Sequence, residues 1–397
     1  MHYVKLLSRP KLTGVAGGGL KLALVCNVAN DLGDKLLQKR LELFVGLQIN
    51  AQSPSAPYIQ LSEPGSLWWD PSKHVTKMSF VLGAAIKHAI EAGEAVSVTI
   101  AVHNQSVRAE SIEHIMSAVY HAGDLSRSIL SVTAWLSGPW AEIASSRRLR
   151  LSSDSSPQYL VLGEHGQESI ARHVWDGGLL AMSMLAGMFT FSDDWASRDG
   201  AMSQLRRFFT QHGGISILEL GCGVGALGIG LGSVYPRSEG ECNILMTDCP
   251  DAEESARLNI SSLLHEQRSG HSESCARVTY ENLDWEDGQN GLFGPAVRQR
   301  RWDLVMLSDC TYNADSIPLL VRTLSAIHRL NLESAVDGTK PAPTRLFVAT
   351  KHRHEDEAVF FTLLAHENWV KVEEQSVALP VCSGPREAVS IYLYEKI

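Results

Sequence analysis

The sequence predicts an α/β protein in two parts, a doubly wound and mostly parallel sheet preceded by an α+β domain. The length of 397 residues favours two domains. From residue 158 onward, apolar strands alternate with helical segments, which is the pattern of a parallel sheet with crossover helices. The last two predicted strands have no helix between them, so we expect an antiparallel hairpin at one edge of that sheet. We place the domains at residues 1–150 and 158–397.

Two different periods predict the elements of the N-terminal domain. Apolar residues recur at helical spacing over residues 80–92, whereas Val96, Val98 and Ile100 alternate with other residues over a strand at 95–102. The other predictions are a helix at 111–120, an extended segment at 129–136, an amphipathic stretch of either type at 36–47, loops at 14–19 and 52–57, and a linker at 145–157. We find no catalytic constellation in this half.

The C-terminal domain is predicted to hold seven strands. They cover residues 215–220, 243–248, 276–280, 302–308, 345–351, 370–375 and 389–394. Helices are predicted after a glycine-rich turn near residue 225 and over residues 252–264, 316–330 and 356–367. A sheet of this kind binds its ligand at the carboxyl ends of its strands, so the functional residues are expected there.

Composition places the chain among ordinary globular proteins, with 44% hydrophobic and 20% charged residues. The first residues lack the apolar core of a signal peptide, and no run of about 18 apolar residues is present, so we expect no membrane span. The seven cysteines form no CxxC pair and no zinc-type spacing with histidines, so we expect no metal site. Scattered cysteines suit reduced thiols, and we expect a cytoplasmic location, with the nucleus as the alternative.

Charge divides unevenly along the chain. Residues 1–150 carry 15 basic and 11 acidic residues, a net charge of +4, whereas the remainder carries 20 and 33, a net charge of −13. An acidic catalytic domain suits a basic substrate and argues against a nucleic acid. The alternative is that the acidic surface only aids solubility.

The strongest motif is the segment ILELGCGVGALG at residues 217–228. A strand runs into Gly221, Gly223 and Gly225, and glycines there permit a tight turn and let a ligand lie against bare backbone. A single GxGxxG would be weak evidence, because nicotinamide enzymes share it. Here Glu219 precedes a GxGxG, which is the form used to bind S-adenosylmethionine.

Two further acidic positions follow the next strands. Asp248 ends the second strand, where a carboxylate accepts hydrogen bonds from ribose hydroxyls; the alternative is a helix cap. Asp284 and Trp285 follow the third strand, where a carboxylate and an aromatic ring can bind the adenine amino group and cover the base. The alternative for Trp285 is packing on the core.

From residue 158 the chain resembles the class I, seven-stranded lysine methyltransferases of eukaryotes, known as methyltransferase family 16. The resemblance rests on ordered blocks: Trp175 in VWDGG, Glu219 to Gly225, Asp248, the pair Asp284–Trp285, SDCTYN at residues 308–313, and TKHR at 350–353. It implies a Rossmann-like sheet, S-adenosylmethionine as cofactor, and cofactor contacts from Trp175 and Ser308. It also implies a protein substrate. Relatives that act on translation elongation factors carry N-terminal extensions. Because the predicted chemistry lies wholly C-terminal to residue 150, residues 1–150 are expected to dock the substrate.

The segment SDCTYN contains the Asp-x-x-Tyr signature of that family at the end of the fourth strand. Asp309 is predicted to hold the substrate ammonium and Tyr312 to orient the amine. The alternative makes Asp309 a structural cap and Tyr312 a wall of the site. Cys310 between them is not expected to be a nucleophile, because methyl transfer needs no covalent intermediate.

Other functions remain open from the sequence. The substrate could be another protein side chain, such as histidine or arginine, an RNA or a small molecule. Nucleic-acid amino methyltransferases often carry (D/N)PP(Y/F) where this chain has SDCTYN, which counts against that class. A catalytically silent scaffold of the same fold is a further alternative, and the intact glycine motif argues against it.

Overall fold

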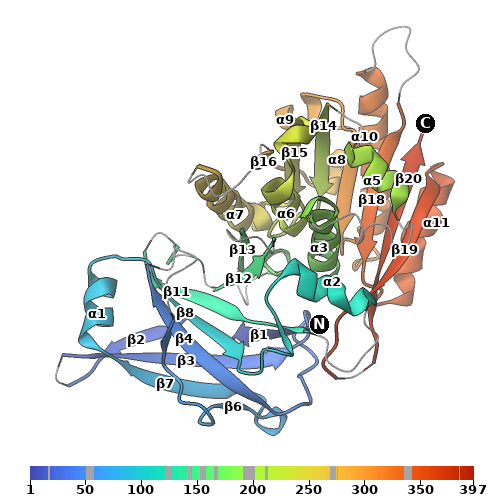
Figure 1. The fold of residues 1–397 in the computed structure, drawn as a ribbon. Coiled ribbons are helices and arrows are strands. Elements are labelled where there is room, and N and C mark those ends of the chain that lie inside the picture. Colours follow the sequence, from blue (N-terminus) through green and yellow to red (C-terminus); the bar gives the residue numbers. More distant parts are fainter. Residues whose placement is uncertain are drawn as a thin grey trace. The chain divides into compact units, whose positions relative to one another are not determined.

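The computed structural model describes the chain in two compact units. It describes all residues except 17, 51–57, 121–126, 139, 142, 144, 153–157, 165–168, 191–201, 211–212, 269–273, 275, 335–341 and 384. The N-terminal unit contains residues 1–150, 161–173 and 380–386, and the C-terminal unit contains 151–160, 174–379 and 387–397. Each unit is therefore built from separate stretches of chain (Figure 1). This division differs from the contiguous domains that we expected from the sequence.

Two β-sheets form most of the described N-terminal unit. The first has the order β2-β3-β1-β10-β9, with β7 paired to β3, and the second has the order β13-β12-β11-β8-β4-β5, with β6 paired to β4. Two helices, α1 (Ala84–Glu91) and α2 (Ile112–Tyr120), accompany them. The strands are β1 (His2–Leu6), β2 (Lys11–Gly14), β3 (Leu20–Ala29), β4 (Leu41–Ile49), β5 (Ile59–Gln60), β6 (Trp68–Trp69), β7 (Thr76–Leu82), β8 (Val96–Val102), β9 (Arg108–Ala109), β10 (Ile129–Leu130), β11 (Val132–Ser137), β12 (Ser145–Arg150) and β13 (Tyr159–Glu164).

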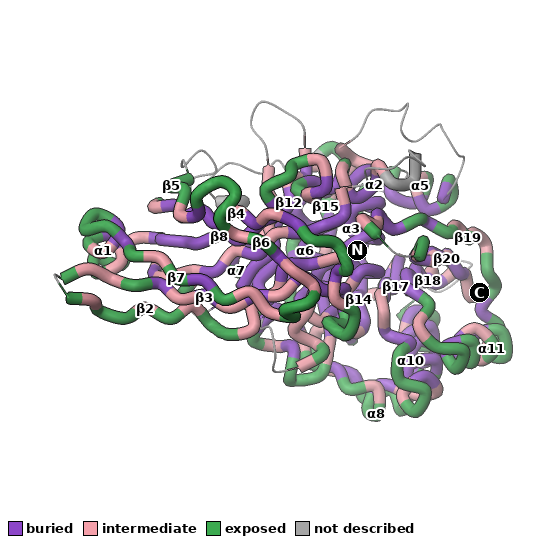
Figure 2. The backbone as a smooth tube through the Cα atoms, turned by 90° about the horizontal axis from the view of Figure 1, so that it is seen from below, coloured by how far each residue is buried: buried purple, intermediate pink, exposed green. Residues whose placement is uncertain are grey.

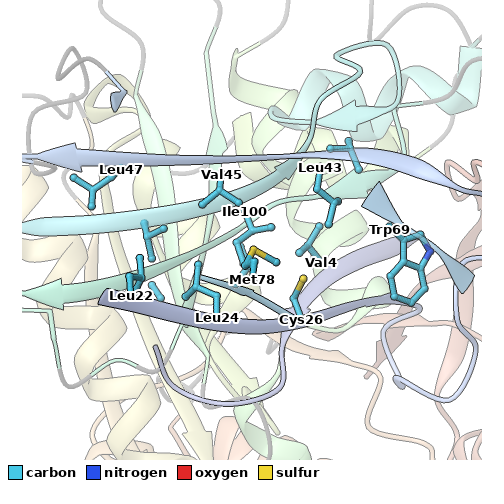
Figure 3. Close-up of a cluster of buried hydrophobic side chains, with 14 of the residues drawn as sticks. Val4, Leu22, Leu24, Cys26, Leu43, Val45, Leu47, Trp69, Met78 and Ile100 are labelled. Carbon is cyan, nitrogen blue, oxygen red and sulfur yellow. The ribbon is translucent and has the colours of Figure 1, made fainter. Parts of the chain in front are cut away.

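The two sheets share one apolar core, which Figure 3 shows in close-up. Alternate residues of β3, such as Leu22 and Leu24, contact the same cluster as Leu43 and Val45 of β4. The period of two places every second side chain of each strand on this inner face. Cys382, from the segment between the last two strands of the chain, also packs against this core.

Two predictions for this unit were wrong in part. The predicted helix at 80–92 begins only at Ala84, because residues 76–82 pair along their length with β3 as β7. The predicted linker begins with strand β12, in which Arg147 is buried and its Nε lies 2.6 Å from Oε2 of Glu164. Buried ion pairs between polar segments carry no signal in a single sequence. The predicted loop at 52–57 lies outside the described residues.

The C-terminal unit has the predicted α/β fold, a Rossmann-like sheet of seven strands among its described residues. Their order is β16-β15-β14-β17-β18-β20-β19; the first five run parallel, and β20 and β19 form the antiparallel hairpin. The central strands are buried, as expected for a sheet covered on both faces (Figure 2). The strands are β14 (Gly214–Leu220), β15 (Glu241–Asp248), β16 (Arg277–Asn282), β17 (Leu304–Ser308), β18 (Thr344–Thr350), β19 (Val370–Ala378) and β20 (Ala388–Lys396).

Four helices follow the strands as the sequence predicts, near residue 225 and over residues 252–264, 316–330 and 356–367, and four further helices among the described residues were not predicted. The helices are α3 (Asp176–Thr190), α5 (Ser203–Thr210), α6 (Ala226–Val234), α7 (Pro250–Arg268), α8 (Trp285–Gly288), α9 (Pro295–Arg298), α10 (Ile317–Glu333) and α11 (Ala358–His366). Helix α3 was not predicted, because residues 176–187 are buried all round and show no polar face. No helix in the described part of the chain is both long and apolar enough to cross a membrane.

Candidate cofactor and active site

A glycine turn joins β14 to α6. Gly221, Gly223 and Gly225 have φ values of 63°, 55° and 83°, in the left-handed region that favours glycine. A Cβ on Gly221 would lie 2.6 Å from Sγ of Cys310, and one on Gly225 would lie 2.5 Å from Cε of Met246. Both the backbone conformation and the close packing of Cys310 and Met246 therefore require glycine in this turn.

Glu219, two residues before the turn, is 1% exposed. Its Oε2 accepts a hydrogen bond from the Gly228 N–H at 2.9 Å, so it ties β14 to the first turns of α6. Burial raises the pKa of Glu219 to about 8. The Glu219 side chain therefore holds the two ends of the glycine turn together.

Asp248 stands at the carboxyl end of β15, beside the same turn. Its Oδ2 accepts a hydrogen bond from the Gly223 N–H at 2.7 Å, and its Oδ1 accepts one from the Cys249 N–H at 2.7 Å. Burial raises the pKa of Asp248 above its usual range. Carboxylate oxygens have lone pairs for more than one donor, so these bonds leave the predicted ribose contact feasible.

Asp284 and Trp285 follow β16, the strand that pairs with β15. Asp284 is the N-cap of α8, and its Oδ1 accepts a hydrogen bond from the Glu286 N–H at 2.9 Å. A Cβ on Gly221 would lie 3.2 Å from Cζ2 of Trp285, so the indole lies directly against the glycine turn. The adenine contact stays a prediction for both residues.

The start of α3 lies against the end of β17. A Cβ on Gly178 would lie 3.0 Å from Oγ of Ser308, so the missing side chain permits this approach. The guanidinium of Arg353 stacks over the ring of Trp175, with Cζ 5.3 Å from the ring centroid. The two residues predicted to contact the cofactor from these segments, Trp175 and Ser308, therefore lie on adjoining elements.

Asp309 is 5% exposed and has a left-handed backbone with φ of 51°. Its Oδ2 accepts a hydrogen bond from the Gly177 N–H at 2.7 Å, and its Oδ1 accepts one from the Lys351 N–H at 3.1 Å. Nη2 of Arg353 lies 3.7 Å from the same Oδ1. The carboxylate thus anchors the N-terminus of α3, as its structural alternative described; a role in holding substrate ammonium stays a prediction.

Tyr312 and Cys310 differ sharply in exposure. The Tyr312 side chain is 56% exposed, and burial of part of the phenol raises its pKa above the usual value, so the hydroxyl stays protonated. Cys310 is buried, and burial raises the pKa of its thiol well above the usual value. Its Sγ lies 3.5 Å from the Leu220 carbonyl oxygen and 3.6 Å from that of Gly221. Cys310 therefore packs the Asp-x-x-Tyr segment against the glycine turn.

Sequence reasoning missed one buried group at this edge of the sheet. Nζ of Lys351 lies 2.8 Å from Oδ2 of Asp176 and 2.8 Å from Oε2 of Glu387. Asp176 is fully buried and Lys351 is 7% exposed. Both residues stand inside blocks that resemble the family, but nothing in a single sequence indicates that they pair.

The residues at this edge fit S-adenosylmethionine. The glycine turn has a left-handed backbone without side chains, Asp248 binds the Gly223 N–H at its edge, and the ring of Trp285 lies against Gly221. Gly221, Gly223, Asp248 and Trp285 would hold the cofactor, which supplies an electrophilic methyl group on a sulfonium. The fold and the glycine turn are those of the class I methyltransferase fold.

The family follows from comparison with known proteins. The model of the lysine methyltransferase family matches residues 154–367, more than half of the chain. The chain therefore belongs to the lysine methyltransferase family.

Relatives among curated proteins are distant. The UPF0665 family protein C23C4.06c of Schizosaccharomyces pombe is 29% identical over 49% of this chain and 46% of its own length. The protein N-terminal and lysine N-methyltransferase EFM7 of Cryptococcus neoformans is 26% identical over 36% of this chain and 48% of its own length. The aligned regions thus span about half the length of these relatives.

Two of the solved structures that are similar to part of this chain are the following. Precorrin-6y C5,15-methyltransferase from Geobacter metallireducens is 12% identical, covers 52% of this chain and 94% of its own, and has a TM-score of 0.32. TrmK of M. capricolum, in complex with S-adenosylhomocysteine, is 9% identical, and the match covers 49% of this chain and 67% of the TrmK chain, with a TM-score of 0.28.

Proposed function

We propose that this methyltransferase modifies the side-chain amine of a lysine in a protein. The observation that carries the proposal is the position of the Asp-x-x-Tyr segment, which Cys310 holds against the glycine turn. Half-exposed Tyr312 is then available at the edge where the cofactor residues gather. The family assignment and the acidic balance of the C-terminal half support the same substrate class.

The chain's own residues contribute mainly by positioning. S-adenosylmethionine, held by the residues of the glycine turn, would supply an electrophilic methyl group to the amine nitrogen, whose proton would pass to solvent. Tyr312, neutral at the pH of a cell, can accept or donate a hydrogen bond and so aim the amine. Asp309 accepts hydrogen bonds from the backbone N–H groups of Gly177 and Lys351, and its charge favours the approach of a cation.

The substrate that we propose is a translation factor, as the sequence resemblance favours, acted on in the cytoplasm. A protein N-terminus is the second candidate, because a relative is named a protein N-terminal and lysine N-methyltransferase. A lysine side chain and a protein N-terminus are both amines on proteins, so one experiment separates these two substrates from RNA and small molecules.

The test is transfer of a radiolabelled methyl group into a lysate of cells that lack this protein. We expect label in a protein band that disappears with protease and survives nuclease, and methyl-lysine in its hydrolysate by mass spectrometry. Gly223→Arg serves as the control without cofactor binding. Label in RNA, on histidine or arginine, or only in small molecules would contradict the proposal.

A further inference from the structure

A buried cation stands at the end of β18, outside the set of residues that the sequence assigned to the site. Lys351 contacts the carboxylates of Asp176 and Glu387, both at 2.8 Å. Asp176 is the first residue of α3, and Glu387 directly precedes β20. One ammonium therefore joins three segments that are far apart in the chain.

A buried ion pair of this kind contributes little net free energy to folding, so its retention suggests a role in positioning. Taking a lysine and an aspartate out of water costs several kcal/mol per ion, and their attraction returns it only when the geometry is good. The sheet does not need this pair, because β18 already forms backbone ladders with β17 on one side and β20 on the other. What the pair adds is a fixed position for the start of α3.

A second set of contacts ties the same segments together. Asp309, at the end of β17, accepts hydrogen bonds from the N–H groups of Gly177 and Lys351. The start of α3 is thus held twice, by a side-chain ion pair to Lys351 and by a carboxylate that also binds the Lys351 backbone. Trp175 directly precedes this turn and lies under Arg353.

We propose that Lys351 is a positioning residue for methyl transfer. Its ammonium fixes Asp176, and through Asp176 the first turn of α3, so that Trp175 and the backbone at Gly177 and Gly178 lie against the cofactor site. Lys351 acts through these neighbours. The proposal rests on cofactor binding and not on the identity of the methylated substrate.

The chain offers a matched control on the same strand. Arg345 stands at the opposite end of β18, and its Nε lies 2.9 Å from Oε1 of Glu395 on β20. Lys351→Met and Arg345→Met therefore each remove a cation paired with the C-terminal hairpin, one beside the site and one far along the strand.

The experiment is calorimetric titration of the full-length variants with S-adenosylhomocysteine, alongside thermal melting. We expect Lys351→Met to raise the Kd at least tenfold, about 1.4 kcal/mol. Lys351→Arg and Arg345→Met should stay within threefold of the native chain, even where their melting temperatures fall. Hydrogen exchange should also quicken at residues 174–180 in Lys351→Met alone.

A Lys351→Met variant that melts lower but binds within threefold of the native chain would overturn the positioning role. If that variant does not fold, Glu387→Gln and its matched control Glu395→Gln decide the question. We then expect a Kd at least threefold higher for Glu387→Gln only, and equal affinities would overturn the proposal. Lysate labelling by the native chain tests the lysine substrate separately, so the two proposals fail independently.

Discussion

Single residues at the glycine turn decide what the site can hold. Gly223 has a left-handed backbone, and its N–H donates to Asp248. Glu219 is buried and binds the Gly228 N–H, and the buried carboxylate of Asp309 binds the N–H groups of Gly177 and Lys351. These carboxylates therefore hold the backbone of the glycine turn and of the start of α3 in place. We predict a separate effect for the substitution of each one.

Gly223→Arg should abolish S-adenosylmethionine binding in a chain that is still folded. A side chain there is strained by about 1–2 kcal/mol and occupies space beside Asp248 that the cofactor needs. Calorimetric titration checks this, with circular dichroism for the fold. The control is Gly213→Arg, since Gly213 precedes β14 at the other end and has open space around it. Unchanged affinity in Gly223→Arg would refute the assignment of the turn.

Asp309→Ala should lower turnover by about a hundredfold or more, because lost positioning alone can cost that much. The structure adds a second effect. The N–H groups of Gly177 and Lys351 lose their acceptor, so the free energy of unfolding should fall by about 1–3 kcal/mol. Cofactor affinity should change by no more than about tenfold.

Tyr312→Phe is the companion variant. It should cost less turnover and leave the free energy of unfolding unchanged, because the ring is half exposed and still shapes the site. Initial rates and urea unfolding of both variants check the pair. Near-normal turnover in Asp309→Ala at saturating substrate would make that residue purely structural.

The pKa of Glu219 predicts a pH dependence of stability. The pKa is about 8 in the folded chain and near its ordinary value in the unfolded chain, so the folded state binds the extra proton between these values. Stability from this group is therefore full below the ordinary pKa and is lost as pH rises toward 8, at up to about 1.4 kcal/mol per pH unit. Glu219→Gln should flatten this slope in urea unfolding between pH 5 and 8. Parallel slopes in the two proteins would contradict the assignment.

At the scale of elements, the close approach of α3 to the end of β17 depends on two glycines, Gly177 and Gly178. A Cβ on Gly177 would lie 2.5 Å from Oδ2 of Asp309, and the carboxylate could not keep its place. The helix itself is apolar all round and has no exposed face to guide it. Its position therefore depends on close backbone contact and on the ionic contacts at its first turn.

Gly177→Ala should accordingly displace the first turn of α3. We expect a loss of about 1–3 kcal/mol in the free energy of unfolding, the usual cost of overpacking, together with weaker binding of S-adenosylhomocysteine. Gly83→Ala is the control, because Gly83 is also at a helix N-terminus, caps α1 and has open space around it. Equal unfolding curves for native and Gly177→Ala chains would show that this contact is not tight.

At the scale of the whole molecule, the two units interleave along the chain. Residues 161–173 and 380–386 group with the N-terminal unit, and Cys382 packs against its core. The segment 380–386 interrupts the C-terminal hairpin directly before Glu387. A truncated chain that starts near residue 155 would keep residues 161–173 and 380–386 but would lose the N-terminal strands with which they group.

We therefore expect a chain starting at residue 155 to aggregate. A chain starting at residue 174, with 380–386 replaced by a short Gly-Ser loop, should be soluble and bind S-adenosylhomocysteine. If residues 1–150 dock the substrate, this shorter chain should still methylate its protein substrate poorly. Soluble yield, melting temperature and labelling rate check these expectations. A simple truncation that melts like the loop-replaced chain would show that the segments need no N-terminal partner.

The sequence by itself determined the sheet, its terminal hairpin and the glycine turn. Each is encoded locally, by strand periods, by the absence of a helix before β20 and by glycines that no other residue can replace. Glu219, Asp248 and Trp285 were found because they occur at fixed distances from that turn. Only the tertiary structure decided how Asp309 is used and that Lys351 pairs with Asp176. Asp309 binds backbone groups 132 and 42 residues away, and Lys351 pairs with a carboxylate 175 residues away. Such contacts depend on the folded path of the chain, and no local pattern of residues records them.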